Sequence, residues 1–369
     1  MLRMWISLFV IACIAGAAQI RPAARQLAPT PTLEASIDAL LAPVVSSQRV
    51  PGISLAIVEN GRTIYAKGRG TTSLTEQLPP TLDTQYRLAS VSKPFTAVAV
   101  FQLVQDGKVK LDEPARLYCP ELSALNGAPT VRHFLMHRSG MRHTTDADDT
   151  TIKGAMPRFG ISLLKVVREP LRFMPGTKTL YTSWGYTALG CVIETSSGKS
   201  YADFMKERVF ARAGLTATTF DHPGYTSRTF SPGFRGGVVW GLRPSEVVDT
   251  RFKTPASGLI STVADMTRFA SALFDGTLLS NDLVAEMFRV ERDSEGRAGF
   301  SAGWTPKGRT TLGAVFDYNG SMEGSTAFLE VLPEKRYGLA LLANRERFVP
   351  ELQPIVIEAR QLVLEAKQR

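Results

Sequence analysis

A serine and a lysine three residues apart, Ser90 and Lys93, are the side chains of this sequence best suited to covalent chemistry. They precede the apolar stretch 97–104, which is typical of a buried helix. On a helix, residues i and i+3 share a face with Cβ atoms about 5–6 Å apart, so the lysine nitrogen can reach the serine oxygen. A lysine desolvated by burial can be neutral and accept the serine proton. The alternative is a serine that caps the helix and a solvated lysine.

A tyrosine near a second helix start is the next candidate. Pro175-Gly176 predicts a turn, and Tyr181 follows it, just ahead of the helical pattern at 184–194. A phenol has an ordinary pKa near 10 and becomes a useful acid or base beside a cation such as Lys93, which favours the phenolate. The alternative is that Tyr181 is an ordinary loop residue and that Ser183 caps the helix.

The chain carries three short motifs in a familiar order. They are Ser90-x-x-Lys93, Tyr181-x-Ser183 and Tyr318-Asn319-Gly320. This order and spacing resemble the motifs of the serine β-lactamases and penicillin-recognising hydrolases, particularly class C β-lactamases and the related D-amino-acid peptidases and esterases. Two supporting stretches, residues 130–140 and 255–262, also resemble this family, and the likeness covers roughly residues 35–345.

The resemblance implies an acyl-enzyme mechanism. Ser90 would attack a carbonyl carbon, Lys93 and Tyr181 would share the transfer of its proton, and water would then release the acyl group. The implied oxyanion site consists of the backbone N–H groups of Ser90 and Ser321. Gly320 would leave room for a substrate that lies along the strand edge. The residues implied in substrate binding are Ser183, Tyr318, Gly320 and Ser321.

Two departures from the family pattern bear on the substrate. Ser183 stands where class C enzymes have asparagine, and it offers a shorter reach and fewer donors. The third motif usually opens with lysine or histidine, whereas Tyr318 is uncharged at neutral pH. A shift of one residue in the alignment would put Asn319 in that position. Either assignment favours esters or peptide-like substrates over anionic β-lactams.

The sequence therefore predicts a serine hydrolase that cleaves an ester, amide or peptide bond through an acyl-Ser90 intermediate. The alternative from another class is a noncatalytic relative that binds cell-envelope peptides or assembles with itself, suggested by Ser183 and Tyr318. No cofactor is implied. The expected partner is a small-molecule or peptide substrate, and the oligomeric state is left open.

Other candidate sites are weaker. His133 and His137 have the i, i+4 spacing of a zinc pair on a helix, but Phe134 stands where a zinc protease has glutamate and no third ligand is evident. The cluster Asp146, Asp148 and Asp149 lacks the glycine and the final glutamate of a calcium loop. The sequence contains no Gly-x-x-x-x-Gly-Lys loop. No metal is implied.

Strand patterns lie at both ends of the chain, with helical patterns between them. A helix is predicted over 33–45 and a hairpin over 53–58 and 63–68, joined at Asn60-Gly61. Helical spacing marks residues 131–136, 162–167, 184–194 and 201–210. Strands are predicted at 313–316, 327–331 and 337–342, and a closing helix after Pro354, over 355–366.

This arrangement predicts an α+β protein with a β-lactamase/transpeptidase-like fold. An antiparallel sheet flanked by helices would form from residues 33–89 and 255–369, and a mainly helical second subdomain from 90–254. The roughly 350 residues that follow the predicted N-terminal signal exceed one simple core, which also favours two subdomains.

The first 18 residues read as a secretory signal, with Arg3, an apolar stretch from Trp5 and the small residues Ala15-Gly16-Ala17. Residues 19–32 then form a tether. We expect a secreted or periplasmic protein; a lipoprotein anchor at Cys13 and an uncleaved membrane anchor are the alternatives. The net charge is +9, but basic residues are interleaved with acidic ones, so no nucleic-acid partner is expected, and no membrane contact beyond an N-terminal anchor.

Two cysteines follow the signal, Cys119 and Cys191. An oxidising compartment would allow a bridge between them. Cys191 lies on an apolar helical face with Trp184 and Ala188, which favours a buried free thiol, with the disulfide as the alternative.

Overall fold

The computed structural model describes residues 32–367 except 48, 77, 153 and 238–240. Its contacts divide the chain into Met1–Thr32 and Leu33–Arg369, and all described helices and strands belong to the second unit. The predicted signal, Cys13 and nearly all of the predicted tether lie outside the described residues.

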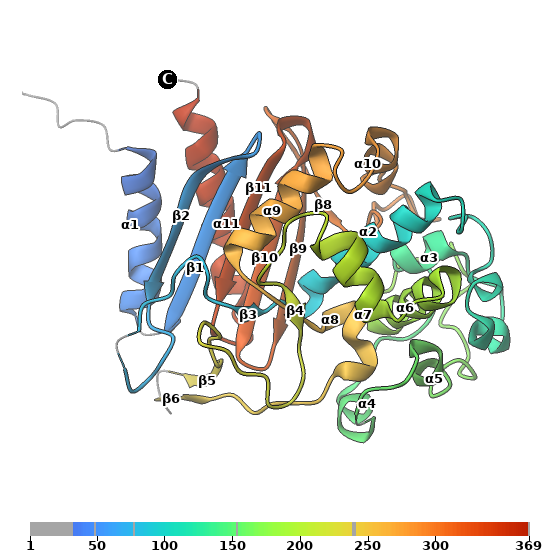
Figure 1. Cartoon of the computed structure of the whole chain (residues 1–369). Helices are drawn as coiled ribbons and strands as arrows, with labels where there is room; N and C mark the ends of the chain where they lie inside the picture. Colours follow the sequence, from blue (N-terminus) through green and yellow to red (C-terminus); the bar gives the residue numbers. More distant parts are fainter. Residues whose placement is uncertain (1–31, 48, 77, 153, 238–240, 368–369) are drawn as a thin grey trace, which may run out of the picture. The chain divides into compact units, whose positions relative to one another are not determined.

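Strands from both ends of the chain form one antiparallel sheet, in the order β2-β1-β11-β10-β9-β8 (Figure 1). The N-terminal hairpin pairs directly with the C-terminal strand, from Ile53 opposite Ala343 to Glu59 opposite Tyr337. The predicted sheet from distant parts of the chain is therefore confirmed. Its strands are β1 (Gly52–Glu59), β2 (Arg62–Gly70), β8 (Thr305–Thr310), β9 (Gly313–Met322), β10 (Ser325–Leu332) and β11 (Tyr337–Ala343).

The turn between β1 and β2 has the geometry that its residues favour. Asn60 and Gly61 both have positive φ angles, 49° and 75°. These are the backbone angles that a two-residue hairpin turn requires and that Asn-Gly adopts at little cost. The predicted hairpin is confirmed.

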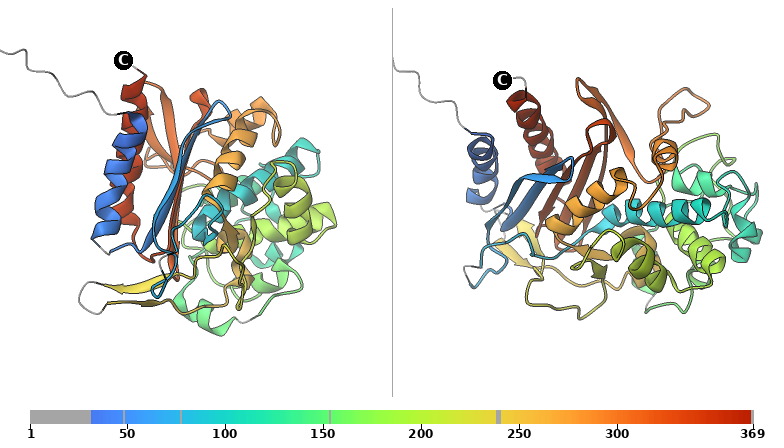
Figure 2. Two further views of the ribbon diagram at one scale, coloured as in Figure 1. Left: turned by 60° about the vertical axis from the view of Figure 1, so that its left-hand side comes forward. Right: turned by 45° about the horizontal axis from the view of Figure 1, so that its top comes forward.

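The two faces of the sheet bury different sets of residues because side chains alternate along each strand. Leu55 and Ile57 of β1 pack with Ile37 of helix α1 (Leu33–Ser46) and Leu352 of helix α11 (Val349–Ala366). Ala56, which lies between them, belongs to the cluster on the opposite face. Figure 2 shows α1 and α11 together on one side of the sheet and helix α9 (Val263–Phe274) on the other.

The closing helix begins earlier than predicted. Helix α11 starts at Val349 and contains Pro354, although the sequence analysis places the start after this proline. Leu352 is fully buried against the sheet and precedes the proline. Burial of the first turn thus offsets the hydrogen bond that Pro354 cannot donate.

The remaining helices lie beside α9 on that face of the sheet (Figure 1). They are α2 (Ser92–Gln105), α3 (Val131–Leu135), α4 (Asp146–Thr151), α5 (Phe159–Leu163), α6 (Ser183–Ser197), α7 (Tyr201–Phe204), α8 (Thr254–Ser257) and α10 (Asn281–Met287). Short 3-10 turns are η1 (Ala89–Val91), η2 (Ala115–Leu117), η3 (Pro120–Ala124), η5 (Arg251–Lys253) and η6 (Pro333–Lys335), and a π-helix, η4, spans Met205–Phe210. Small sheets join β3 (Tyr86–Arg87), β7 (Leu259–Ser261) and β4 (Thr219–Phe220), and β5 (Phe234–Gly237) with β6 (Gly241–Pro244).

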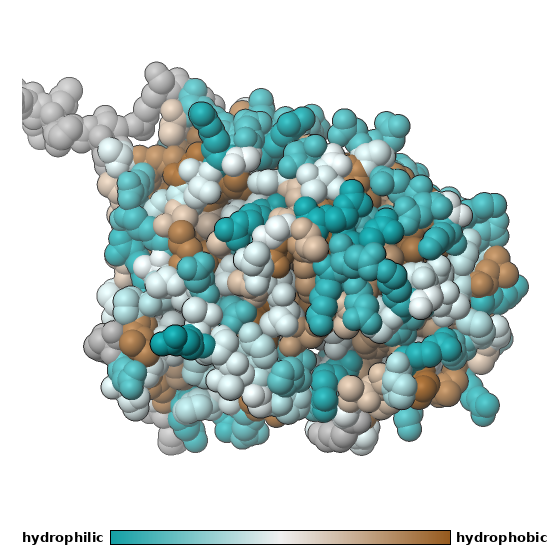
Figure 3. All heavy atoms as spheres, viewed as in Figure 1, coloured by the Kyte–Doolittle hydropathy of each residue, from teal (hydrophilic) through white to brown (hydrophobic). Residues whose placement is uncertain are grey.

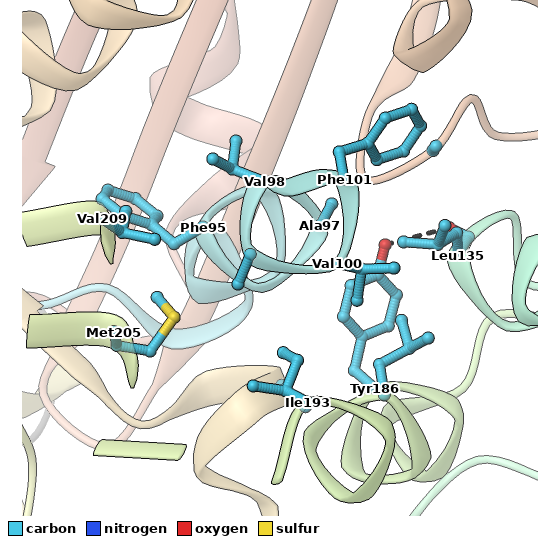
Figure 4. Packing of buried hydrophobic residues seen from close by; sticks show 14 of the residues in the cluster. Phe95, Ala97, Val98, Val100, Phe101, Leu135, Tyr186, Ile193, Met205 and Val209 are labelled. Carbon is cyan, nitrogen blue, oxygen red and sulfur yellow. Dashed lines mark hydrogen bonds between the residues drawn. The ribbon is translucent and has the colours of Figure 1, made fainter. Parts of the chain in front are cut away.

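Helix α2 forms the centre of this helical region. All residues from Ser92 to Leu103 are buried, as the uniformly apolar sequence predicts. Phe95 stacks on Phe269 of α9 with ring centroids 3.8 Å apart. Figure 4 shows α2 enclosed by side chains from several other helices, including Tyr186 of α6. The polar groups at the start of α2 are therefore held on a rigid, buried element.

Cys119 and Cys191 form a disulfide, so the expectation of a free thiol at Cys191 is wrong. Helical spacing correctly places Cys191 in the core, where it is fully buried. It does not reveal what packs on that face. The turns η2 and η3 bring Cys119 against α6, with the two Cα atoms 5.6 Å apart, which suits a disulfide.

We expect the double variant Cys119→Ala/Cys191→Ala to lose about 2–4 kcal/mol of unfolding free energy, because the bridge closes a long loop in the unfolded chain. The sequence separation of the two cysteines is 72. Urea denaturation with and without reductant measures this. Reductant should destabilise the native chain and leave the double variant unchanged. Equal stability of both chains, or three reactive thiols in the unfolded full-length protein, would contradict the bridge.

The viewed face carries apolar residues scattered among hydrophilic ones (Figure 3). Among the described helices, none combines the length and apolar character that crossing a bilayer requires.

Candidate active site

Ser90 lies in the 3-10 turn η1, directly before α2, and its side chain is half-buried. The turn begins with Ala89, which has a φ of 48°, a left-handed conformation that costs a non-glycine residue free energy. Two hydrogen bonds of the fully buried Ser92 fix this backbone: its hydroxyl donates to Ala89 O at 2.8 Å and accepts from Leu259 N at 3.1 Å. The serine is held on a strained, well-supported turn.

Lys93 projects from the first turn of α2 toward Ser90 and is fully buried. Its Nζ lies 3.1 Å from Ser90 Oγ, 2.6 Å from Tyr181 Oη and 2.9 Å from Ala256 O. Burial holds the pKa of Lys93 well below its usual value, and the positive charge of Lys253 lowers it further. The alternative of a solvated lysine is excluded, and a neutral amine is accessible at this position.

Tyr181 completes a compact hydrogen-bonded group with these two residues. Its Oη lies 2.6 Å from Ser90 Oγ as well as 2.6 Å from Lys93 Nζ. Burial raises the pKa of Tyr181, although hydrogen bonds with Ser90, Tyr318 and Ser183 act in the opposite direction. The expectation that Lys93 favours the phenolate is therefore wrong in its net direction, since desolvation outweighs these contacts.

Ser183 is the first residue of α6 and faces the same group. Its Oγ lies 3.5 Å from Lys93 Nζ, the longest of the lysine contacts. The helix cap is Thr182, whose side chain accepts from Gly185 N, so the alternative of Ser183 as the cap is wrong. The Ser183 side chain is left free to face the reacting groups.

Strand β9 passes close to Ser90. Tyr318 is buried, with its hydroxyl 3.0 Å from Nε2 of His137 and its ring centroid 5.9 Å from Lys93 Nζ. Asn319, the next residue, points to the other face of the strand because side chains alternate. Of the two residues that could open the third motif, Tyr318 is the one whose side chain contacts the Ser90–Lys93–Tyr181 group.

Gly320 lies against the backbone of the serine. A Cβ atom at this position would be 2.6 Å from Ser90 N and 2.8 Å from Leu88 O. Glycine is therefore needed at position 320 for a second reason, beyond the expected one of leaving room for a substrate. A side chain here would press on the nucleophile's own turn, besides obstructing a substrate on the strand.

We expect Gly320→Ala to lower kcat/KM about 100-fold or more, because the added Cβ displaces Ser90 N, an implied oxyanion donor. Steady-state kinetics measures this. Gly338→Ala is the matched control, since its Cβ would clash at 2.6 Å with Ala270 in the same sheet but away from the serine. That control should lose stability and keep its activity per folded molecule. Wild-type kcat/KM in Gly320→Ala would contradict the assignment.

Two pockets meet at Ser90, and both are also lined by Ser321. The first, of about 310 Å³, is mainly polar and includes Ser183, His143 and Lys253. The second, of about 470 Å³, includes Tyr181, Phe300, Tyr318, Asn319, Gly320 and Lys307. All seven residues that the sequence analysis selected therefore lie in or beside one continuous site.

The structure adds three residues that the sequence analysis did not select for the site. Lys253 of η5 is buried, paired with Asp149, and close enough to lower the pKa of Lys93. His143 accepts a hydrogen bond from Ser183 N at 3.1 Å, and burial, Lys93 and Lys253 lower its pKa to about 4. Phe300 packs against Tyr181. No local sequence signal marks these residues, because each reaches the site from a different loop.

The histidine pair considered for zinc does not form a common site. Helix α3 ends at Leu135, and His137 has a φ of 56°, so the pair does not share a helical face. His133 caps its own helix by hydrogen bonding to Thr130 N. Among the described residues, the only clustered potential ligands are Cys119, Glu121 and Cys191, and their cysteines are bridged.

Comparison with known proteins gives consistent results. A family model described as Beta-lactamase matches residues 37–361. Protein flp of Staphylococcus aureus (strain MW2) is 22% identical over 326 residues, which are 86% of this chain and 64% of flp; this chain thus spans less than two thirds of that relative. The structure of D-amino acid amidase from Ochrobactrum anthropi SV3, complexed with L-phenylalanine amide, is 25% identical with a TM-score of 0.77, covering 91% of this chain and 99% of the amidase.

The octameric penicillin-binding protein homologue from Pyrococcus abyssi has the same fold, with 24% identity and a TM-score of 0.73. The aligned region covers 84% of this chain and 73% of the homologue. The predicted β-lactamase/transpeptidase-like fold is therefore confirmed.

Proposed function

Because this chain belongs to the beta-lactamase family, whose model spans residues 37–361, we propose that it is a serine hydrolase acting through an acyl-Ser90 intermediate. The family and its D-amino acid amidase neighbour support a serine hydrolase-type function. The substrates that we propose are small amides and esters of amino acids.

One observation carries this proposal. The oxygen of Ser90 lies within hydrogen-bond distance of both an amine and a phenol, 3.1 Å from Lys93 Nζ and 2.6 Å from Tyr181 Oη. A serine becomes a nucleophile when an adjacent base accepts its proton. Burial of Lys93 makes the neutral amine accessible, and Tyr181 bridges the two groups.

The hydroxyl proton of Ser90 is transferred in two stages. When Ser90 Oγ bonds to the substrate carbonyl carbon, its proton passes to the Lys93–Tyr181 pair. As the bond to the leaving group breaks, the pair returns that proton to the leaving amine or alcohol. Water then adds to the acyl carbon and gives one proton to the same pair. The pair returns this proton to Ser90 Oγ as the acid departs. The two residues titrate as a coupled pair, so their working pKa values belong to the pair.

Negative charge on the carbonyl oxygen would be stabilised by the backbone N–H groups of Ser90 and Ser321. Strand β8 pairs with β9 only as far as Asp317, opposite Thr305. Among the described strands, none covers that edge of β9 from Tyr318 onward. The backbone N–H and C=O groups along this edge can therefore form hydrogen bonds with a substrate that lies beside the nucleophile.

The second pocket favours an apolar, uncharged substrate group. Tyr181, Phe300 and Val349 present apolar surface there. Lys307, at the register shift between Pro306 and Gly308, is the cation that lines this pocket, and it is paired at 3.3 Å with the buried Asp317. Its charge is compensated, so an anionic β-lactam would find little net attraction. The named ligand of the neighbouring amidase, L-phenylalanine amide, has an aromatic side chain and an uncharged amide of the size that this pocket would accept.

A turnover screen tests the proposal. It comprises D- and L-phenylalanine amide, a nitrophenyl ester, D-alanyl-D-alanine and a chromogenic cephalosporin. We expect turnover of an amide or the ester above that of the cephalosporin, and a fluorophosphonate adduct on Ser90 in peptide mass spectrometry. A folded protein that turns over none of these substrates and takes no label would reject the hydrolase and leave the noncatalytic binding role.

A further inference from the structure

The carboxylate of Glu121 lies against both sulfur atoms of the disulfide. Its Oε2 is 3.4 Å from Cys119 Sγ and 3.4 Å from Cys191 Sγ. The sulfurs of a disulfide carry no hydrogen, so they cannot donate to this oxygen. Among the described residues, the side chain that donates to the carboxylate is Arg158, which approaches the other oxygen, Oε1, at 3.4 Å. An anionic oxygen is thus held beside two sulfurs that do not compensate its charge.

The fold makes room for this carboxylate. A Cβ atom at Gly160 of α5 would lie 2.4 Å from Glu121 Oε1 and 2.8 Å from Oε2. Both cysteines are fully buried, whereas 21% of the Glu121 side chain is exposed. The group is therefore closed around the sulfurs and open to solvent at the carboxylate, which gives an ion a route to the sulfurs.

The three atoms have the spacing of ligands to one zinc ion. Zinc binds thiolate sulfur at about 2.3 Å and carboxylate oxygen at about 2.0–2.2 Å, with tetrahedral angles. A sulfur and an oxygen on the same zinc are then about 3.5 Å apart, close to the 3.4 Å from Oε2 to each cysteine. Two sulfurs on the same zinc lie about 3.8 Å apart. Reduced cysteines with Cα atoms 5.6 Å apart reach this separation by rotating their side chains.

We propose that the reduced protein binds one zinc ion through the thiolates of Cys119 and Cys191 and the carboxylate of Glu121, with water as the fourth ligand. A dithiol reductant supplies two electrons and two protons, so that the S–S bond breaks and the reductant leaves as its own disulfide. Zinc then displaces the two thiol protons and bonds to both sulfurs and to Oε2. The resulting group carries one net negative charge, which the guanidinium of Arg158 faces.

This site would keep the same two segments together in both redox states. The disulfide joins the residue before η3 to α6, and α6 begins with Ser183, whose hydroxyl faces Lys93. Zinc would replace the covalent link once the disulfide is reduced. The inference goes beyond the proposed hydrolase function and does not depend on it, because the three ligands lie outside both pockets at Ser90.

Titration with Co²⁺, a spectroscopic substitute for zinc, tests the proposal. The full-length protein is reduced with a phosphine, stripped of metal and titrated without oxygen. We expect thiolate-to-cobalt charge-transfer absorption and the visible bands of tetrahedral cobalt, saturating at one ion per chain. Zinc should remove these bands with a Kd of about 1 µM or lower. The oxidised protein should show none of them. Their absence from the reduced protein would overturn the proposal.

Three variants assign the ligands. Glu121→Gln keeps the shape of the side chain and removes its charge, and it should weaken zinc binding about 100-fold or more. Glu358→Gln, which changes an exposed carboxylate on α11, is the matched control and should bind as the native chain does. Cys119→Ala/Cys191→Ala keeps Cys13 and should show no charge-transfer band. Native affinity in either the Glu121 variant or the double variant would place the ion elsewhere and reject the site.

A second measurement covers the case in which reduction unfolds the protein. Near-ultraviolet circular dichroism reports tertiary structure at each step. Zinc should restore the native spectrum of a reduced chain that has unfolded, and it should raise the urea midpoint of one that has stayed folded. The oxidised protein and the double variant should not respond to zinc. A reduced chain that zinc neither refolds nor stabilises would contradict the proposal, whatever its activity as a hydrolase.

Discussion

Replacing Ser90 with alanine is expected to lower kcat about 10⁴-fold or more on any substrate that the native chain hydrolyses, because no other group can form the acyl intermediate. Ser90 is only half-buried, so the variant should fold and retain its stability. Steady-state kinetics measures the loss, and intact-mass analysis should detect no acyl or fluorophosphonate adduct.

Ser162→Ala is the matched control for this experiment. Ser162 lies on α5 outside both pockets, and its buried hydroxyl has no hydrogen-bond partner among the described residues. The same chemical change there should leave turnover unchanged. Activity in Ser90→Ala within tenfold of the native chain would rule out the acyl-Ser90 mechanism.

Replacing Lys93 with methionine is expected to lower kcat about 10²- to 10⁴-fold, the usual contribution of a positioned acid or base. Methionine fills a similar volume and cannot accept a proton. The loss should appear in kcat more than in KM, because Lys93 is buried behind Ser90 and Tyr181. Turnover and single-turnover acylation rates measure it.

The same variant should change how stability depends on pH. The folded-state pKa of Lys93 is far below the value of about 10.5 expected in the unfolded chain, so the unfolded state binds more protons between the two. In the native chain, Lys93 therefore makes stability rise with pH through that window. Lys93→Met should remove this rise and be relatively more stable near neutral pH than near pH 10.

Urea denaturation at several pH values checks this effect. Lys206→Met, which removes an exposed ammonium, is the control and should follow the native pH dependence. If the unfolding free energies of Lys93→Met and of the native chain change with pH in parallel, Lys93 keeps an ordinary pKa. A neutral amine would then be inaccessible and the proposed proton route would fail.

Several parts of the fold could be predicted because they depend on local sequence. The Asn60-Gly61 turn, the alternation in β1 and the apolar run of α2 each depend on residues close together in the chain. Predictions failed where a distant contact decided the outcome. Burial of Leu352 extends α11 through Pro354, and packing of η2 and η3 on α6 joins Cys119 to Cys191.

The helical segments at 162–167 and 201–210 show the same limit. The first becomes α5 at Phe159–Leu163, and the second divides into α7 and the π-helix Met205–Phe210. Apolar spacing indicates which residues are buried, and it does not distinguish an α-helix from a tighter or wider turn.

The sequence by itself determined the types of residue at the candidate site and their order along the chain. They are a serine and a lysine on one helical turn, a tyrosine before a second helix, and a glycine on a late strand. It could do so because these motifs are short and their spacing has direct geometric meaning. Only the tertiary structure decided the environment. Burial, together with Lys253, sets the pKa direction of Lys93, and burial sets that of Tyr181. The hydrogen bond between His137 and Tyr318 exists because a loop and strand β9, 181 residues apart in sequence, meet beside the reacting groups. Desolvation and hydrogen-bond direction depend on every element packed around a group, and such contacts leave no local pattern in the chain.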